Sequence, residues 1–503
     1  MKKIIINDNS WQIRIAIITN GKLQNIYFSA PTHEVLERAY FKGLVTKVLP
    51  GIQTAFIEFG QQKAGFLHIS EIDRELAMQK ISIHLEDDEE EQPKIEKKIT
   101  QKRDISKILK ENEPILVQVS KEPVHEKGAK LTTCFTLPGR FIVLMPNIPR
   151  IGVSKKIENR DERTRLKNIV RERLPEGMGA IIRTTSDGCA EKDLINDLTY
   201  LVQEWHSIEK RFASAKPTEK IYEDLPLVLQ IIRDHLDSSI EAIITDSTKS
   251  QNELYKFAKN IAPEFAHVIQ SYNDTINIFS AFGIEKQIEQ ALKKKVSLKS
   301  GGSIIIESTE AMTVIDVNTG RFIGKTNLEE TILKTNLEAA EEIVQQLKLR
   351  NIGGLIVIDF IDMGIIANRQ KVFSFFEKIL KERDKFQSVV LKISEFGLVQ
   401  MTRKRSGKTL VQELTTDCPT CHGLGFIKSY QTESYAILRA VKDELKTISP
   451  GKKIGLQINT QVFNYITSVE YDAILKLENS YNIKITLLSN KELPVDKYKI
   501  EKN

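Results

Sequence analysis

The stretch "LIVIDFID", residues 355–362, is a nearly continuous apolar run that ends in a carboxylate, Asp359. An apolar run of this length is typical of a buried central strand. A second stretch, "TVIDVNTG" at residues 313–320, has the same form and carries Asp316 near its end. Between them, the apolar residues of 326–350 recur with helical periodicity. The pattern predicts two neighbouring strands joined by a crossover helix.

Two carboxylates brought together in this way are unfavourable unless a cation neutralises them or one of them is protonated. We therefore expect a hard-metal site at Asp316 and Asp359. Mg²⁺ fits best, because it takes one or two carboxylates and shares the rest of its sphere with water and phosphate oxygens. Asn318 lies two residues beyond Asp316, on the same strand face, where its amide would orient the carboxylate. The alternative is that both aspartates cap strand ends or pair with Arg321 and Arg369.

Three further side chains near these strands are candidates for the same site. Asp362 follows the second strand and could join the ligands of the metal. Arg321 and Lys325 follow the first strand and could clamp a phosphate, although a solvated loop explains them equally well.

The composition is that of a globular protein with several domains. The chain has 503 residues, too many for one core, and 41% of them are hydrophobic and 28% charged, which excludes a disordered, fibrous or membrane class. The N-terminus predicts neither a signal peptide nor an anchor, and no apolar stretch is long enough to cross a membrane. We therefore expect a cytoplasmic protein. The net charge of +6 is mild for a nucleic-acid binder.

The first third of the chain predicts mostly strands. Residues 3–28 alternate strand-like segments with turn signals, including Asn20-Gly21, and indicate an antiparallel meander. Residues 40–72 contain short strands with scattered aromatics, which suits a small barrel, and "PILVQVSKE" at 114–122 would close it. The charged run at 84–103 is interpreted as a solvated loop inserted into the barrel.

The middle of the chain mixes both kinds of element. Strand-like segments between 131 and 185 surround a charged helical stretch near 158–173. From 190 to 300 helical periodicity dominates, with one strand expected at 240–246. The fold class predicted for the whole chain is α+β with several domains.

The only closely spaced cysteine pair, Cys418 and Cys421, lies in "DCPTCHGLGF", residues 417–426. A tetrahedral zinc site needs four ligands, and this stretch offers two thiolates. His422 is a candidate third ligand. A redox pair is the competing interpretation, and it fits poorly because no thioredoxin-like βαβ pattern surrounds the cysteines.

The other two cysteines, Cys134 and Cys189, stand alone in the sequence. Four cysteines in a chain of this length do not make a disulfide framework. We interpret the isolated pair as small buried apolar residues rather than reactive thiols.

Four motifs follow one another along the chain: "VIDVNTGR", "GGLIVIDFIDM", "FGLVQMTRKR" and "CPTCHG". With these motifs the chain resembles the ribonuclease E/G family of bacterial endoribonucleases, over essentially its whole length. Several motifs spaced over a hundred residues are far more specific than any one of them. The length and the form "FGLVQMTRKR" resemble the ribonuclease G branch of that family.

The resemblance implies a fold of several subdomains, in which an RNase H-like subdomain is split into two segments by two insertions. The implied order is the first RNase H-like segment (1–34), an S-one-type OB-fold (35–130, with a charged insertion at 84–112), a 5′-sensor subdomain (131–221), the second RNase H-like segment (222–291), a DNase I-like catalytic subdomain (292–414), a zinc link (415–427) and a small C-terminal domain (428–503).

The resemblance also implies an activity, the magnesium-dependent cleavage of single-stranded RNA. Asp316 and Asp359 match the Mg²⁺ ligands of the family, and Asn318 matches its supporting amide. The products would carry 5′-phosphate and 3′-hydroxyl ends. The implied substrates are ribosomal RNA precursors and messenger RNA.

Two groups of residues match positions that bind RNA in the family. Phe56 and Phe66 match aromatic residues that stack on bases, and Lys127 matches a basic residue that grips the strand. Stacking contributes about 1–3 kcal/mol per base and tolerates any sequence. Arg183 and Thr184 match the pocket for a 5′-monophosphate, where an arginine offers a planar fork of donors.

One position departs from the family pattern. The ribonuclease E branch has a further arginine of that pocket near "DKFQSVV", where this chain has Gln387 with Lys385 close by. This departure leaves the strength of 5′-end sensing open.

The family builds a four-cysteine zinc site from two chains. Cys418 and Cys421 therefore imply a homodimer about a two-fold axis, and such dimers could assemble further.

Two other functions stand as alternatives to the ribonuclease. A non-catalytic RNA- or ribosome-binding factor could use the same barrel, and it predicts that Asp316 is dispensable. A metal-dependent nuclease of DNA is disfavoured, because the barrel and the motifs favour single-stranded RNA.

Overall fold

The structure is a computed structural model, and it describes residues 2–30, 35–72, 104–123, 128–237, 239–320, 328–384, 386–394, 397–405 and 407–502. The chain divides into two compact units, Met1–Leu410 and Val411–Asn503. Each unit has hydrophobic cores of its own.

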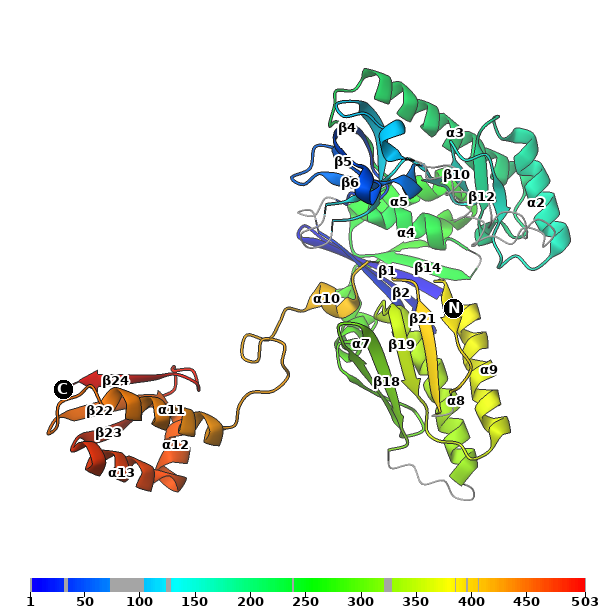
Figure 1. Ribbon diagram of the computed structural model, residues 1–503. Helices are drawn as coiled ribbons and strands as arrows, with labels where there is room; N and C mark the ends of the chain where they lie inside the picture. Colours follow the sequence, from blue (N-terminus) through cyan, green and yellow to red (C-terminus); the bar gives the residue numbers. More distant parts are fainter. Residues whose placement is uncertain are drawn as a thin grey trace. The chain divides into compact units, whose positions relative to one another are not determined.

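The first sheet joins the N-terminal strands to strands from much later in the chain (Figure 1). Its strands are, in spatial order, β15 (Ile269–Ser271), β14 (Ile240–Thr245), β1 (Lys2–Asn9), β2 (Gln12–Thr19) and β3 (Lys22–Ser29). The strands β1 to β3 form the predicted antiparallel meander, and both residues of the Asn20-Gly21 turn have positive φ. The helices α4 (Leu227–His235) and α5 (Thr248–Ile261) bury their apolar residues against this sheet.

Five strands form a closed barrel, as the sequence predicts. They are, in spatial order, β4 (Tyr40–Leu49), β5 (Thr54–Glu58), β6 (Gly65–His68), β8 (Lys130–Thr132) and β7 (Pro114–Lys121), and β7 pairs back with β4. Gly43 permits tight packing inside the barrel, because a Cβ there would lie 2.3 Å from a methyl carbon of Ile57.

The last residues of the insertion that the resemblance implies, 84–112, contribute to the barrel core. Ile105 and Leu109 are buried there, beyond the run at 84–103 that is interpreted as a solvated loop. Two apolar residues in a charged stretch are a weak signal in sequence, and only the packing reveals their place. The residues of the insertion before 104 lie outside the described ones.

A four-stranded sheet with two helices follows the barrel. Its strands are β11 (Ile151–Val153), β12 (Gly179–Ile182), β10 (Ile142–Met145) and β9 (Leu137–Pro138), and its helices are α2 (Arg160–Arg173) and α3 (Glu191–Ser214). One face of each helix packs into a shared core with the sheet. The short strand β13 (Lys220–Tyr222) then pairs with β4 at the edge of the barrel.

The third large sheet contains both aspartate strands. Its strands are, in spatial order, β16 (Lys295–Ser297), β17 (Ser303–Ser308), β18 (Met312–Asn318), β19 (Gly354–Asp359), β21 (Leu398–Arg403) and β20 (Ser388–Val390). The helices α8 (Leu328–Leu349) and α9 (Ile366–Arg383) lie side by side along one face of it (Figure 1). The short helices α6 (Ile278–Ala281) and α7 (Ile284–Ala291) precede the sheet in the chain, and α10 (Leu410–Leu414) follows it.

The C-terminal unit is a small α/β structure. It contains three strands in the order β23 (Lys484–Asn490), β22 (Lys453–Asn459) and β24 (Tyr498–Lys502), and the helices α11 (Tyr430–Leu445), α12 (Thr460–Val469) and α13 (Tyr471–Tyr481). The strands β22 and β23 are parallel, and α12 and α13 make the crossover between them.

The mixed α/β architecture and the closed barrel agree with the fold expected from the sequence. The names and boundaries of the individual subdomains stay predictions. Among the residues that the structure describes, no helix combines the length and the apolar character that a membrane crossing requires.

Candidate active site

The two aspartates of the sequence motifs are direct neighbours in the third sheet. The strands β18 and β19 run parallel, and Asp316 is in register with Asp359. Neighbouring strands lie about 4.8 Å apart. The helix α8 connects the two strands, which is why the chain can place them side by side with the same direction. The structure therefore brings together the pair that the sequence predicted.

Both aspartates lie on the face of the sheet that the helices leave open. The apolar residues Ile315 and Ile358, which precede them, are buried against α8 and α9. Side chains alternate between the two faces of a strand, so Asp316 and Asp359 point away from this core. Asp316 is half-buried and Asp359 is exposed. A substrate therefore has access to both carboxylates.

The electrostatics of the pair favour a bound cation. Partial burial and the charges of Asp316 and Asp362 raise the pKa of the Asp359 carboxyl above its usual value. A divalent cation between the carboxylates would relieve this repulsion. Among the described residues, no three His, Cys, Asp or Glu side chains are gathered as they would be around a metal. One or two carboxylates are a donor set that Mg²⁺ accepts, because it keeps most of its waters.

Asn318 orients the first carboxylate. Its Nδ2 donates a hydrogen bond of 2.6 Å to Oδ2 of Asp316. The backbone of Gly302 lies close to the end of this strand. A Cβ at Gly302 would lie 2.7 Å from the carbonyl oxygen of Asn318. The glycine therefore permits the close β17–β18 contact that places Asn318 beside the site.

The loop after β19 carries Asp362 and is tied to α8. Asn336 donates from Nδ2 to the carbonyl of Ile361 at 2.8 Å and accepts from its backbone N–H at 3.1 Å. The carboxylate of Glu329 accepts from the backbone N–H of Ile365 at 3.1 Å. Asp362 itself is exposed, and its charge reaches Asp359 without adding a third ligand to the pair.

The alternative that the two aspartates pair with Arg321 and Arg369 is wrong for Arg369. Nε of Arg369 donates to the carbonyl of Met363 at 2.6 Å. Within the described chain, Arg369 makes no ion pair with Asp316 or Asp359. Arg321 and the phosphate-clamp candidate Lys325 lie outside the described residues.

The two barrel phenylalanines form a pair on the outside of the barrel. Phe56 in β5 is in register with Phe66 in β6. Their strand neighbours Ala55, Ile57 and Leu67 point into the barrel core, and both phenylalanines are half-buried and outside that core. They are therefore not core residues, and their ring faces are partly accessible. RNA stacking on them stays a prediction, and Lys127 lies outside the described residues.

The 5′-phosphate candidates follow β12. NH1 of Arg183 donates to the carbonyl of Gly139 at 2.6 Å and to Oδ1 of Asp234 at 2.7 Å. These bonds hold the guanidinium in place, and Nε and NH2 have no partner among the described residues. Thr184 is exposed, and its hydroxyl lies 3.0 Å from that of Ser154.

A buried ion pair that the sequence did not predict lies near Gln387, the residue that differs from the family pattern. Arg403 of "FGLVQMTRKR" donates from Nε to Oδ2 of Asp384 at 2.6 Å, and both side chains are almost fully buried. The carbonyl of Asp384 accepts from Nζ of Lys156 at 3.0 Å, which links the β11–α2 segment to the third sheet. No local pattern could have found this network, because its members are far apart in sequence. Gln387 is exposed, and Lys385 lies outside the described residues.

The cysteine pair lies in a tight turn. The backbone N–H of His422 donates to the carbonyl of Cys418 at 2.7 Å. Hydrogen bonds from the backbone of Cys421 and Thr420 lower the pKa of the Cys418 thiol, which favours the thiolate that a metal needs. Among the described residues, neither His422 nor another side chain completes a three-ligand group with the cysteines.

The two isolated cysteines differ slightly from the prediction. Cys134 and Cys189 are partly rather than fully buried. Burial raises the pKa of the Cys189 thiol, which disfavours the reactive thiolate.

Comparison with known proteins places these features in a family. A model described as "Ribonuclease E/G family" matches residues 136–406. The chain belongs to the ribonuclease E/G family. A second model, described as "RNase E/G, Thioredoxin-like domain", matches residues 417–503 of this family member. Membership confirms the resemblance seen in the motifs and, with it, the predicted enzyme class of an endoribonuclease.

Individual ribonucleases match this family member over most of its length. Ribonuclease G of Salmonella typhimurium is 38% identical over 442 residues, 87% of each chain. Ribonuclease G of Escherichia coli is 39% identical over 439 residues, again 87% of each chain. Ribonuclease E of Haemophilus influenzae is 34% identical over 504 residues, which are 99% of this chain and 52% of the relative.

The second family model corrects the expectation that no thioredoxin-like context surrounds the cysteines. The matched domain begins at Asp417 and contains the parallel β22–α12–α13–β23 unit. The cysteines precede α11, so they lie outside that unit in the chain. The sequence pattern missed the context because the parallel strands begin only at Lys453, far beyond the pair.

Proposed function

We propose that this ribonuclease E/G family member is a magnesium-dependent endoribonuclease of single-stranded RNA. The observation that carries the proposal is the pair of in-register aspartates, Asp316 and Asp359, on the open face of the third sheet. The relatives are named ribonucleases, which gives RNA as the substrate class. The proposed cleavage leaves 5′-phosphate and 3′-hydroxyl ends and serves ribosomal RNA maturation and messenger RNA decay.

In this proposal the aspartate pair holds Mg²⁺ and the chain supplies its placement. When bound, the metal polarises the scissile phosphate and activates a water for in-line attack. Asn318 holds the Asp316 carboxylate in one orientation through its 2.6 Å hydrogen bond. The contacts from α8 to the loop after β19 keep the exit of the second strand in place.

We propose that the barrel grips the RNA strand through its outward phenylalanines. Phe56 and Phe66 are adjacent, so two bases could stack on one platform. Lys47 lies in register with Phe56 and is exposed, so a cation flanks the aromatic pair. Such a surface binds single strands because only an unpaired base offers a free ring face.

We propose that Arg183 and Thr184 receive a 5′-monophosphate. The bonds to Asp234 and Gly139 hold the arginine in one position and leave Nε and NH2 for a phosphate. A preference for monophosphorylated substrates follows, since a 5′-hydroxyl end gives these donors nothing to meet.

We propose that two chains share a zinc ion through Cys418 and Cys421. The turn offers two thiolates, and a four-coordinate site then requires two more from a second copy. The side chains of Leu424 and Phe426, just after the turn, are 66% and 72% exposed, which suits burial against a partner. The cytoplasmic location stays a prediction.

The test is incubation of the full chain with a 5′-monophosphorylated, single-stranded oligoribonucleotide, with magnesium or with a chelator. Cleavage in magnesium alone, with 5′-phosphate and 3′-hydroxyl products, would support the proposal. RNA binding without cleavage in any divalent cation would support the alternative, a non-catalytic RNA- or ribosome-binding factor. Competition by unlabelled single-stranded DNA would reveal a nuclease with a different substrate.

A further inference from the structure

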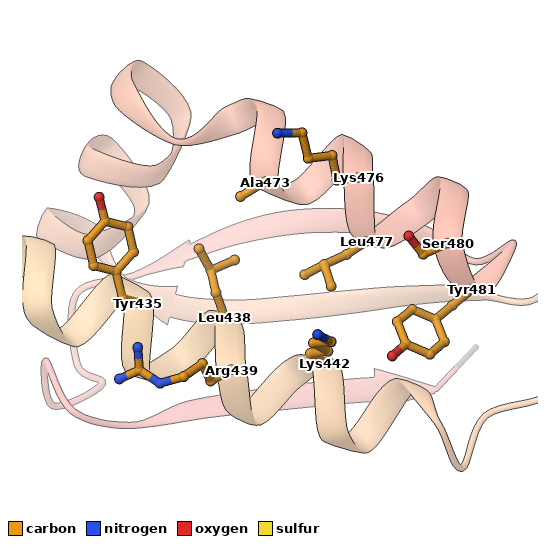
Figure 2. Close-up of a pocket in the computed structure, with 9 residues that line it drawn as sticks. All are labelled: Tyr435, Leu438, Arg439, Lys442, Ala473, Lys476, Leu477, Ser480 and Tyr481. Carbon is orange, nitrogen blue, oxygen red and sulfur yellow. The ribbon is translucent and has the colours of Figure 1, made fainter.

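A groove of about 600 Å³ lies between α11 and α13 in the C-terminal unit (Figure 2). Leu438 and Leu477 lie between the two helices and form its apolar floor. Tyr435 and Tyr481 stand at its opposite ends, each half-buried. Neither the active site nor the cysteine pair uses any of these residues.

The groove is also lined by cations from both helices. Arg439 and Lys442 come from α11 and Lys476 comes from α13, and all three are exposed. Among the residues that the structure describes, no aspartate or glutamate lines the groove. Within the described chain, none of the three cations makes an ion pair, and the nearby Asp443 pairs with Lys446 instead, at 2.6 Å.

The helical spacing explains how the lining arises. On α11, Tyr435, Arg439 and Lys442 follow one another at intervals of four and three residues, so they lie on one face. A helix face that packs against a neighbour is normally apolar. This one carries one aromatic ring and two cations, which favours a polyanion with flat apolar groups.

We propose that this groove binds a single-stranded stretch of the RNA substrate, as a second contact besides the barrel. The inference rests on the proposed function for the identity of the polyanion. Phosphates would meet Arg439, Lys442 and Lys476, and unpaired bases would meet the rings of Tyr435 and Tyr481. A duplex would not satisfy the tyrosines, because its bases are already stacked.

A second copy of the chain is a poorer occupant. In a two-fold interface centred on the groove, the three cations of one copy would lie against those of the other. Like charges opposed in this way are unfavourable unless acids intervene, and the described lining of the groove contains none.

The test compares two triple variants of the full chain in magnesium-free buffer. The groove variant is Arg439→Gln, Lys442→Gln, Lys476→Gln. The matched control is Lys484→Gln, Lys491→Gln, Lys499→Gln, which removes three exposed cations of the same unit away from the groove. Affinity for a long single-stranded oligoribonucleotide is measured over a range of salt concentrations, and sedimentation reports the oligomeric state.

We expect the groove variant to bind RNA more weakly and with less dependence on salt. Each lost phosphate contact lowers the slope of log K against log salt by about 0.7, so three lower it by about 2. The advantage of the wild type should then shrink about twentyfold between 50 and 200 mM salt. The control variant should keep the wild-type slope. Tyr481→Leu, which removes the aromatic ring and keeps an apolar side chain against the core of the unit, should also lower affinity without changing the slope.

Photocrosslinking of 4-thiouridine RNA to the wild type gives a direct second readout. Crosslinks to peptides of α11 or α13 support the proposal. Groove and control variants with equal affinity and slope overturn it, as do crosslinks confined to the barrel. Loss of self-association with unchanged RNA affinity also overturns it and assigns the groove to a second copy. Cleavage by the wild type in magnesium is followed in parallel, so failure of the groove and failure of the nuclease are separate results.

Discussion

Two pairs of side chains in this protein have almost the same geometry and opposite chemistry. In the barrel, Phe56 and Phe66 are in register on neighbouring antiparallel strands and face outward. In the third sheet, Asp316 and Asp359 are in register on neighbouring parallel strands and also face away from the core. Each pair therefore lies on the solvent face of a strand pair whose other face is fully packed.

The difference between the pairs lies in what each gains from its neighbour. Two half-buried rings side by side bury apolar surface and are stable without a ligand. Two carboxylates side by side repel, and this repulsion adds to the effect of partial burial in raising the pKa of Asp359. A cation or a proton relieves it. The aromatic pair suits binding of any base, whereas the acidic pair suits metal-dependent chemistry at one phosphate.

The largest expected effect separates chemistry from binding. Asp316→Asn or Asp359→Asn should lower the cleavage rate by several orders of magnitude and leave RNA affinity nearly unchanged, because each removes one of the two proposed metal carboxylates. Single-turnover kinetics and filter binding measure the two quantities. The control is Asp362→Asn, in an exposed acid of the loop after β19, which should cost far less. Near-normal cleavage by either aspartate variant would remove the pair from the mechanism.

The cysteines extend the comparison to a third pair. One chain supplies only two of the four thiolates that the proposed zinc site needs. We expect about one zinc per two chains by metal analysis and a dimer that a chelator dissociates, because a tetrahedral site needs four thiolates. Cys418→Ser should abolish both the zinc and the dimer. Cys189→Ser, in a thiol away from the turn, should change neither. A stable monomer with one zinc per chain would contradict the shared site.

Asp384 and Arg403 contrast with the aspartate pair, because they are a buried pair of opposite charges on the helix-covered side of the third sheet. Asp384→Ala should lower the free energy of unfolding by about 3–5 kcal/mol, because it leaves the Arg403 guanidinium buried without its partner. Chemical denaturation measures the change. The exposed pair of Lys378 and Glu382 is the control, and Glu382→Ala should cost less than about 1 kcal/mol. Equal costs would mean that burial does not distinguish the two pairs.

End sensing should depend on an arginine that is already held by an acid. Arg183→Ala should slow cleavage of 5′-monophosphorylated RNA until it matches 5′-hydroxyl RNA, a loss worth about 1.5–3 kcal/mol for hydrogen bonds to a charged group. The 5′-hydroxyl substrate is the internal control, since its cleavage should not change. If the wild type already cleaves both substrates equally, this chain does not sense 5′ ends. The exposed Gln387, which stands in place of a further pocket arginine, would then explain the loss.

The smallest effect concerns the aromatic pair. Phe56→Ala should weaken single-strand binding by about 1–3 kcal/mol, the contribution of one stacked base, and leave the rate of the bound complex unchanged. Binding and thermal unfolding are measured together, with Phe66→Ala as the matched partner. A large loss of stability with unchanged affinity would show that the ring supports the barrel instead of binding RNA.

Strong local patterns were predicted correctly, and weak or distant ones were not. The meander, the barrel strands and the β18–α8–β19 unit each have a clear periodicity within a few tens of residues. The buried Ile105 and Leu109 have none, because the barrel residues that they pack against are remote in the chain. The Asp384–Arg403 pair has none either, because two opposite charges 19 residues apart follow no periodic pattern. The groove on the C-terminal unit also escaped sequence reasoning, since exposed lysines on a helix usually indicate only a solvated face.

The sequence by itself singled out the candidate residues. Residue type and spacing suffice for two aspartates at the ends of apolar strands and for one closely spaced cysteine pair, whereas the two phenylalanines follow from the family resemblance. Only the tertiary structure decided that the aspartates are in register, that both phenylalanines lie outside the barrel core, and that Arg183 is held by Asp234. These outcomes depend on strand register and long-range packing, and a residue's neighbours across a sheet are set by the whole fold rather than by its own segment.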